Sequence, residues 1–148
     1  MAAQKNQISL DDARQTLQKV GLRRTASRVA VLRKLAEVAC PMSHVELSEH
    51  LTPEGYDRST IYRCLLDFVE AGLAARIDLG DHVWRFALKQ CGTEKVGDHP
   101  HFLCIDCGEA TCLPEIQVRV GSGRKQSGAT LGEITEVILK GHCPKCAH

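Results

Sequence analysis

Apolar residues recur at helical spacing through the first half of the chain. In segment 25–41 they fall at positions 29, 32, 35, 36 and 39, which share one face of a helix. Ser9 has Asp12 three residues on, and Ser43 has Glu46 at the same spacing. Such pairs are typical of helix N-termini, because the first side chain caps a free backbone N–H group. Helices are therefore predicted to begin at Ser9, Thr25 and Ser43.

A fourth helix is predicted from Asp57 to about residue 71. Apolar positions 61, 65, 68 and 69 form its inner face, and polar residues fall on the other side. Strands are predicted at 73–79 and 82–88, joined by Gly80-Asp81 as a two-residue hairpin turn. Three helices, a fourth with a polar outer face and a hairpin follow the order of a winged helix-turn-helix, in which one helix enters the major groove of DNA.

The pattern becomes more β-like after residue 98. Strands are predicted at 101–106, 116–120 and 133–140, with a loop at 121–128. The polar stretch 89–98 contains two glycines and resembles a joint. The fold class is therefore predicted to be α+β, with a winged-helix domain at 1–88, a hinge at 89–98 and a metal-rich domain at 99–148.

Composition places the chain among soluble globular proteins and points to metal chemistry. Of its 148 residues, 43% are hydrophobic and 25% charged. It has no apolar run long enough to cross a membrane and no secretory signal core, so a cytoplasmic protein is expected. Eight cysteines and seven histidines in such a chain indicate metal or thiol chemistry rather than structural disulfides.

The net charge of +1 conceals a basic segment. Seven Lys or Arg residues and no acid lie between positions 14 and 34, which is typical either of a phosphate-facing surface or of a solvated helix face. Arg and Tyr on the fourth helix are suited to base and phosphate contacts. The predicted DNA-contacting residues are Arg23, Arg28, Ser59, Thr60, Tyr62 and Arg63.

Two cysteine pairs form the sharpest motif. Cys104-x-x-Cys107 and Cys143-x-x-Cys146 together supply four thiolates, the ligand set of a closed tetrahedral Zn²⁺ site. A site without an open coordination position is structural rather than catalytic. Redox thiols and unliganded core cysteines are the alternatives.

A second metal site is predicted upstream of the first cysteine pair. His99 and His101 are two residues apart, so both imidazoles point to one face of an extended strand. Cys112 is a third candidate ligand, and His44, from the N-terminal domain, is the fourth. Such a site would couple metal occupancy to the relative orientation of the domains. The alternative is that these are exposed histidines and a core cysteine. Cys91 and His82 are weaker candidates.

Enzyme motifs are absent from the sequence. It contains no phosphate-binding loop, no G-x-G-x-x-G and no H-E-x-x-H. His44-x-Glu46 lacks the P-C-x-x-C half of a deaminase motif, because Pro144 lies inside the second cysteine pair. We therefore expect neither an enzyme nor a small organic substrate. A zinc-stabilised interaction module without DNA binding remains the rival class.

Taken together, four segments resemble the ferric uptake regulator family of bacterial repressors: GLRRTASR at 21–28, STIYRCL at 59–65, HPHFLCIDCG at 99–108 and CPKC at 143–146. The likeness covers about residues 9–146. It implies a homodimer that binds double-stranded operator DNA, with an N-terminal winged helix and a small α/β dimerisation domain. It also implies a four-Cys structural zinc and a sensory metal site at the domain joint.

By position, Tyr62 and Arg63 match the family's DNA-reading residues, and Arg23 matches a basic residue near the minor groove. His99 and His101 match two sensory ligands, and Cys112 falls where a carboxylate often ligates. The family usually supplies further ligands at the positions of Ala87 and Pro41, which cannot serve.

Two histidines with a cysteine form a softer ligand set than histidines with carboxylates, and thiolate favours Zn²⁺ over Fe²⁺ or Mn²⁺. The resemblance therefore favours a zinc-uptake regulator. An iron- or peroxide-sensing member, or a site whose thiols respond to oxidants instead, remains the alternative.

Overall fold

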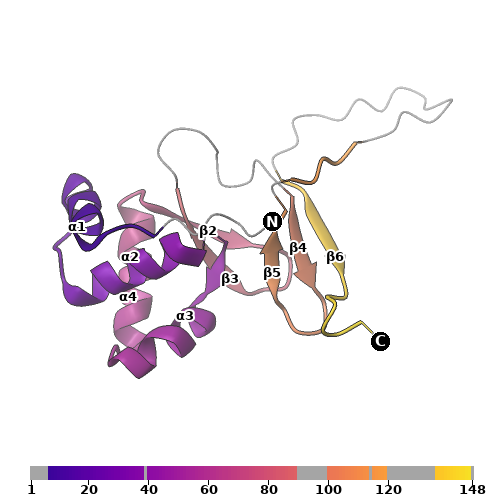
Figure 1. Ribbon diagram of the computed structural model, residues 1–148, viewed down its shortest axis with the longest axis horizontal. Helices are drawn as coiled ribbons and strands as arrows, with labels where there is room; N and C mark the ends of the chain where they lie inside the picture. Colours follow the sequence, from indigo (N-terminus) through magenta and orange to yellow (C-terminus); the bar gives the residue numbers. More distant parts are fainter. Residues whose placement is uncertain (1–6, 39, 90–99, 114, 120–135, 148) are drawn as a thin grey trace, which may run out of the picture.

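The computed structural model describes residues 7–38, 40–89, 100–113, 115–119 and 136–147. A group of helices occupies one end of the molecule, and two small sheets follow toward the other end (Figure 1). The predicted loop at 121–128, His99 and Cys91 lie outside the described residues. No helix within the described ranges has the length and apolar character needed to cross a bilayer.

Four α-helices form where the caps predict them. They are α1 (Leu10–Lys19), α2 (Ala26–Val38), α3 (His44–Leu51) and α4 (Arg58–Glu70), with a short 3-10 helix η1 (Thr52–Glu54) after α3. The Ser9 side chain accepts a hydrogen bond from the Asp12 backbone, and Ser43 and Glu46 form a complete capping box. Asp57 caps α4 by accepting from the next helical N–H groups. These predictions are confirmed, because capping is a local interaction.

The helices and the first sheet enclose one apolar core. Its members are buried aliphatic and aromatic side chains, including Leu17, Leu32, Leu47, Ile61, Leu65, Phe68 and Phe86, each at most 2% exposed. Because α4 contributes its inner face to this core, its outer face is held outward by packing rather than by local propensity alone.

The first sheet has the order β1-β3-β2 and is antiparallel throughout. It contains β1 (Met42–Ser43), β2 (Ala74–Asp78) and β3 (Trp84–Leu88). The strand β1 was not predicted, because two residues carry no periodicity.

The predicted two-residue hairpin turn is wrong, since Asp78 pairs with Trp84 and residues 79–83 connect the strands. Two side-chain bonds build this wider turn: Asp78 accepts from the Gly80 N–H and Asp81 from the Val83 N–H. His82 has a positive φ of 61° within it.

The second sheet has the order β5-β4-β6. It contains β4 (His101–Cys104), β5 (Ala110–Cys112) and β6 (Ile138–Gly141); β5 runs antiparallel and β6 parallel to β4. The strand predicted at 101–106 is found as the shorter β4, and the described part of the strand predicted at 133–140 contains β6; β5 was missed.

The predicted strand at 116–120 is wrong over its described part. Residues 116–119 form no strand, and Ile116 and Val118 are each 46% exposed. Alternation alone does not make a strand where no neighbouring backbone is present to pair with it.

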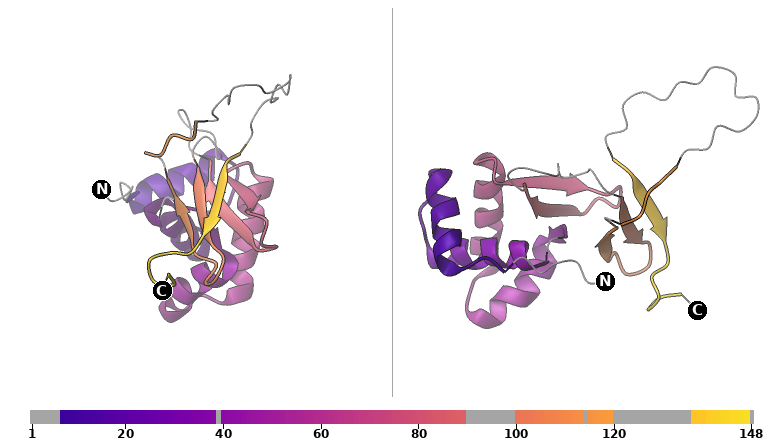
Figure 2. Two further views of the ribbon diagram at one scale, coloured as in Figure 1. Left: turned by 90° about the vertical axis from the view of Figure 1, so that its right-hand side faces the viewer. Right: turned by 45° about the horizontal axis from the view of Figure 1, so that its top comes forward.

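The β2–β3 hairpin lies between the helices and the second sheet (Figure 2). The hairpin is therefore placed to join the helical part to the second sheet.

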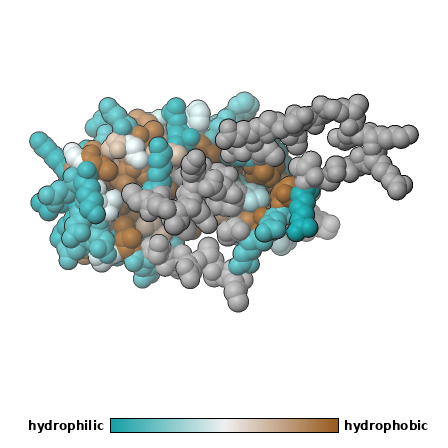
Figure 3. Space-filling model, turned by 90° about the horizontal axis from the view of Figure 1, so that it is seen from above, coloured by the Kyte–Doolittle hydropathy of each residue, from teal (hydrophilic) through white to brown (hydrophobic). Residues whose placement is uncertain are grey.

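Hydrophilic side chains gather over the helical end (Figure 3).

Candidate nucleic-acid interface and metal centre

The outer face of α4 presents a row of polar side chains. Arg58, Ser59, Tyr62 and Arg63 are exposed and Thr60 is half-buried, whereas Ile61 and Leu65 on the other side are fully buried. Helix N-termini and Arg or Tyr side chains are common donors to phosphates and base edges. The geometry is that of a recognition helix in a winged helix-turn-helix.

His44 supports this helix. Its Nε2–H donates to the Arg58 carbonyl at 2.8 Å, and its ring centroid lies 5.2 Å from that of Tyr62. The structure thus turns His44 toward the first turn of α4. Its role as a metal ligand stays a prediction.

Much of the basic segment is used within the fold. Arg28 forms an ion pair with Asp67 at 2.7 Å and also donates to the Arg23 carbonyl, which ties α2 to α4. Arg33 donates to the Ile8 carbonyl, and Lys34 lies 3.5 Å from Glu37. Arg23 is exposed. The DNA contacts predicted for Arg23 and Arg28 stay predictions, but Arg28 has a structural partner that the sequence did not reveal.

The hairpin adds two exposed residues that sequence reasoning missed. The Arg76 guanidinium lies over the Trp84 ring, 4.1 Å from its centroid, on neighbouring strands. A cation–π pair of this kind on the wing offers both a charge and a flat ring to a ligand. The only signal in the sequence is the lone tryptophan of the chain.

The two cysteine pairs meet at one point. The Sγ atoms of Cys104, Cys107, Cys143 and Cys146 all lie within 4.8 Å of one another. The Cys107 and Cys143 sulfurs are 3.9 Å apart. Thiolates about 2.3 Å from a tetrahedral ion lie about 3.8 Å from each other, so the four side chains fit Zn²⁺. Parallel pairing of β6 with β4 brings the second pair to the first.

Hydrogen bonds prepare this cluster unequally for metal. Backbone N–H groups of Cys107 and Cys143 lower the pKa of the Cys104 thiol to about 6. A hydrogen bond with Cys143 raises the pKa of the Cys146 thiol to about 12. A bound divalent cation would hold its thiol ligands as thiolates, because a coordinating thiol is deprotonated.

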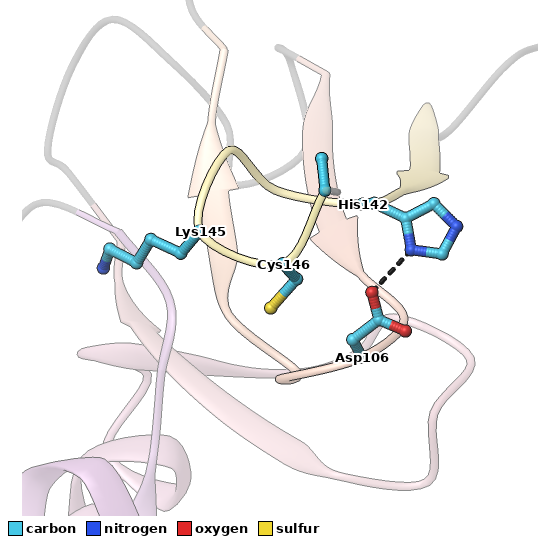
Figure 4. A pocket seen from close by; sticks show the side chains of 5 residues that line it. Asp106, His142, Lys145 and Cys146 are labelled. Carbon is cyan, nitrogen blue, oxygen red and sulfur yellow. Dashed lines mark hydrogen bonds and ion pairs between the residues drawn. The ribbon is translucent and has the colours of Figure 1, made fainter.

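Two exposed ion pairs flank the cysteine cluster. His142 is turned toward Asp106 across a shallow pocket beside Cys146 (Figure 4). The Asp106 carboxylate accepts a hydrogen bond from His142 and raises its pKa. Lys145 pairs with Glu109 at 3.3 Å. Both pairs join the first cysteine turn to the second, so they support the cluster.

Arg85 links the hairpin to the first cysteine turn. Its side chain is only 2% exposed, and its two terminal nitrogens contact both Asp81 oxygens at 2.9 and 2.8 Å. Nη2 also donates to the Gly108 carbonyl at 2.7 Å. The Arg85 hydrogen bonds lower the pKa of Asp81. The sequence placed Arg85 only within the strand predicted at 82–88, because its partners are known only from the fold.

The predicted regulatory residues are partly brought together. His101, which is 2% exposed, lies directly opposite Cys112 in the β4–β5 register. Hydrogen bonding to Cys112 lowers the pKa of the Cys40 thiol to about 6, and the same pairing, together with burial, raises the pKa of Cys112.

Cys40 lies just before β1, in the helical part, and the sequence left its role open. His82 is exposed in the hairpin turn. Among the described residues, one group of three or more potential metal-ligating side chains lies close enough together to hold an ion. It consists of Cys104, Cys107, Cys143 and Cys146, which are called the knuckle cysteines below.

A winged helix joined to a small sheet domain with a four-thiol centre defines the class of metal-responsive DNA-binding regulators. The family model described as the ferric uptake regulator family matches residues 19–131, and the chain belongs to this family.

Several solved structures are similar to this chain over most of its length. The ferric uptake regulator of Vibrio cholerae is 25% identical with a TM-score of 0.64, covering 89% of this chain and 100% of its own. That of Pseudomonas aeruginosa with manganese is 24% identical with a TM-score of 0.56, covering 90% and 98%. A zinc-bound manganese uptake regulator is 18% identical with a TM-score of 0.64, covering 92% and 99%. A comparison with curated protein sequences finds no significant match.

Proposed function

We propose that this protein is a repressor that binds double-stranded operator DNA as a homodimer when Zn²⁺ occupies its regulatory site. A second Zn²⁺ is structural and is held by the four knuckle cysteines. The outer face of α4 reads the DNA, residues 89–98 act as the hinge, and residues 99–148 form the dimerisation domain. No enzymatic step is part of this proposal.

One observation carries the regulatory half of the proposal. His101 and Cys112 lie opposite each other in the second sheet, and hydrogen bonding to Cys112 lowers the pKa of Cys40, a residue of the helical part. A metal held at this junction with His99 would join the DNA-binding part to the dimerisation part. Occupancy would then bias the spacing of the two recognition helices in the dimer, and hence their fit to two half-sites.

The donor set supports Zn²⁺ as the sensed ion. Thiolate and imidazole suit Zn²⁺, whereas carboxylates suit Mn²⁺ and favour harder ions. The fourth ligand is proposed to come from the helical part, where hydrogen bonding to Cys112 lowers the pKa of Cys40 and where His44 faces α4. A manganese-containing and a zinc-bound relative support the view that this fold accepts either ion.

Metal titration tests the sensed ion. A DNA duplex is first selected from a random library by the zinc-loaded protein. Binding to it is then measured by fluorescence anisotropy with Zn²⁺, Mn²⁺ and, without oxygen, Fe²⁺. We expect Zn²⁺ to raise affinity by roughly 5–150-fold, the usual range of allosteric coupling.

The variant His101→Ala should keep the knuckle zinc and lose this activation. Activation by Fe²⁺ or Mn²⁺ at lower free concentration than Zn²⁺ would instead support an iron- or peroxide-sensing member.

Replacing Arg63 with alanine tests the recognition helix. Because Arg63 is exposed on α4, its loss should weaken binding to the selected duplex by roughly 1–3 kcal/mol without changing zinc content or melting temperature. Arg119→Ala, which removes an exposed arginine outside the winged helix, is the matched control with the same change in charge. Wild-type affinity in Arg63→Ala would point to the rival class, a zinc-stabilised module that does not read DNA through α4.

A further inference from the structure

A groove lies on the helical part, lined by the start of α1, one side of α2 and the region of η1. Its volume is about 570 Å³. Small-molecule sites typically measure roughly 300–1,000 Å³, so the groove is large enough for such a ligand. None of the described residues that line it belongs to α4, to either sheet or to the knuckle. The groove is therefore separate from the recognition helix and from both metal sites.

The charges in this groove are mainly positive. Four basic side chains line it: Arg14, Arg24, Arg33 and Lys34. All four belong to the basic segment between positions 14 and 34, and none is on the recognition helix. The acidic lining residues are Glu37, which pairs with Lys34 at 3.5 Å, and Glu54. Four cations against two carboxylates leave an excess of positive charge, which attracts anions into a cleft.

The arginines are placed to hold an oxyanion. Arg33 Nε donates to the Ile8 carbonyl at 3.2 Å, which fixes the segment before α1 against α2. That bond leaves both Nη groups of the guanidinium as donors. Arg24 is exposed just before α2, and Arg14 has only a 3.7 Å ion pair with the exposed Asp11. A guanidinium group matches a carboxylate or phosphate through two parallel hydrogen bonds.

Apolar side chains line the same groove. Val29 and Leu51 are buried there, and Ala30 and Tyr56 are half-buried. Leu10, the first residue of α1, is 50% exposed at the groove. A pocket that combines apolar side chains with a few convergent polar groups is typical of a site for a small organic ligand. A bare inorganic anion would leave this apolar surface in water.

We propose that this groove binds a small organic anion, which carries a carboxylate or phosphate head group on a short apolar body. The guanidinium groups hold the head group, and the apolar side chains bury the body. The bound anion contacts residues of α1, α2 and η1 together, so binding stabilises the helical part. The proposed function is not needed for this inference, because no residue of α4 or of a metal site takes part.

Amide NMR spectra of the full-length, zinc-loaded protein test the site. The probes share one six-carbon chain: hexanoate and hexyl phosphate are the anions, hexanol is neutral and hexylamine is cationic. We expect the two anions to shift the amide signals of Ile8, Ala30 and Tyr56 saturably, with one site per chain. Comparing them shows which head group is preferred. Inorganic phosphate alone should bind more weakly than hexyl phosphate, because it lacks the apolar body.

Three outcomes of this titration would overturn the proposal. The first is binding of hexanol or hexylamine as tightly as the anions. The second is a set of shifts centred on exposed apolar residues of the second sheet, such as Leu139, instead of the groove. The third is the absence of saturable anion binding. If Arg24→Gln then lowers the salt dependence of DNA binding, the groove arginines face DNA phosphates instead.

Variants locate the head group and the body separately. Arg24→Gln should weaken hexyl phosphate binding by roughly 10-fold, the lower end for losing a charge-assisted hydrogen bond. Ala30→Leu should weaken both anions without changing the charge, because the larger side chain fills the groove. Arg119→Gln removes the same charge from an exposed position outside the groove and should bind like the wild type. Wild-type affinity in both Arg24→Gln and Ala30→Leu would refute the site.

Discussion

Replacing Cys143 with serine is expected to remove one zinc ion per chain and to destabilise the protein severely. Cys143 is 7% exposed, and its backbone N–H donates to the Cys104 sulfur at 3.4 Å. Serine cannot supply the thiolate, so the closed site would lose one of its four ligands. Because structural zinc contributes its binding free energy to folding, roughly 10–16 kcal/mol in small zinc peptides, losing it should unfold the second sheet or separate the proposed dimer.

Zinc content, thermal melting and sedimentation measure this effect together. Cys64→Ser is the matched control, since it changes the same atom at a buried cysteine outside the knuckle. That control should keep wild-type zinc and lose little stability. A chelator added to the wild-type protein should reproduce the Cys143→Ser behaviour. A dimeric Cys143→Ser protein with unchanged zinc and an unchanged melting curve would rule out the four-thiolate site.

Replacing Arg85 with alanine is expected to cost up to about 3–5 kcal/mol of folding free energy, the range for breaking a fully buried ion pair on one side; Asp81, at 23% exposure, can regain some hydration. The change leaves the Asp81 carboxylate and the Gly108 carbonyl without their shared donor. Since Gly108 directly follows the first cysteine turn, the hairpin and the knuckle should also lose their common anchor. Arg85→Lys should recover only part of the loss, because an ammonium group cannot form the two-pronged contact.

Urea unfolding at neutral pH measures the Arg85 effect. The matched control is Arg76→Ala on the neighbouring strand, whose exposed cation–π contact with Trp84 contributes about 0.5–1 kcal/mol. A loss in Arg85→Ala no larger than in this control would show that the bridge to Gly108 does not support the fold.

The same ion pair predicts a pH dependence. Asp81 has a lowered pKa in the folded state because Arg85 hydrogen-bonds to it. Its contribution is therefore fully present above its unfolded pKa of 3.8 and is lost as the pH falls through the lower folded value. The difference in unfolding free energy between the wild type and Asp81→Asn should therefore become smaller over this acid range. Any loss of knuckle metal at low pH affects both proteins and cancels in this difference.

The helical part was predictable because its signals are local. Ser9, Ser43 and Asp57 cap helices through bonds to residues two or three positions away, and the apolar period of α4 depends on the same short range. The spacing within each cysteine pair is likewise local, and it predicted the four side chains that the parallel β4–β6 pairing brings together.

The parts that sequence reasoning missed depend on residues that are distant in the chain. The strands β1 and β5 are too short for a period, and each exists because a partner strand lies beside it. The predicted strand at 116–120 had the right alternation, but its described residues have no strand neighbour. The hairpin turn widened because Asp81 serves Arg85 as well as the turn itself.

The sequence alone therefore determined the order of the helices, the outward face of α4 and the four sulfur ligands, since residues within about one helical turn set each of them. Only the tertiary structure decided which distant groups meet: Arg28 with Asp67, Arg85 with the Gly108 carbonyl, and His101 with Cys112. Such contacts depend on how whole elements pack against each other, and a side chain carries no local mark of the partner that packing will bring to it.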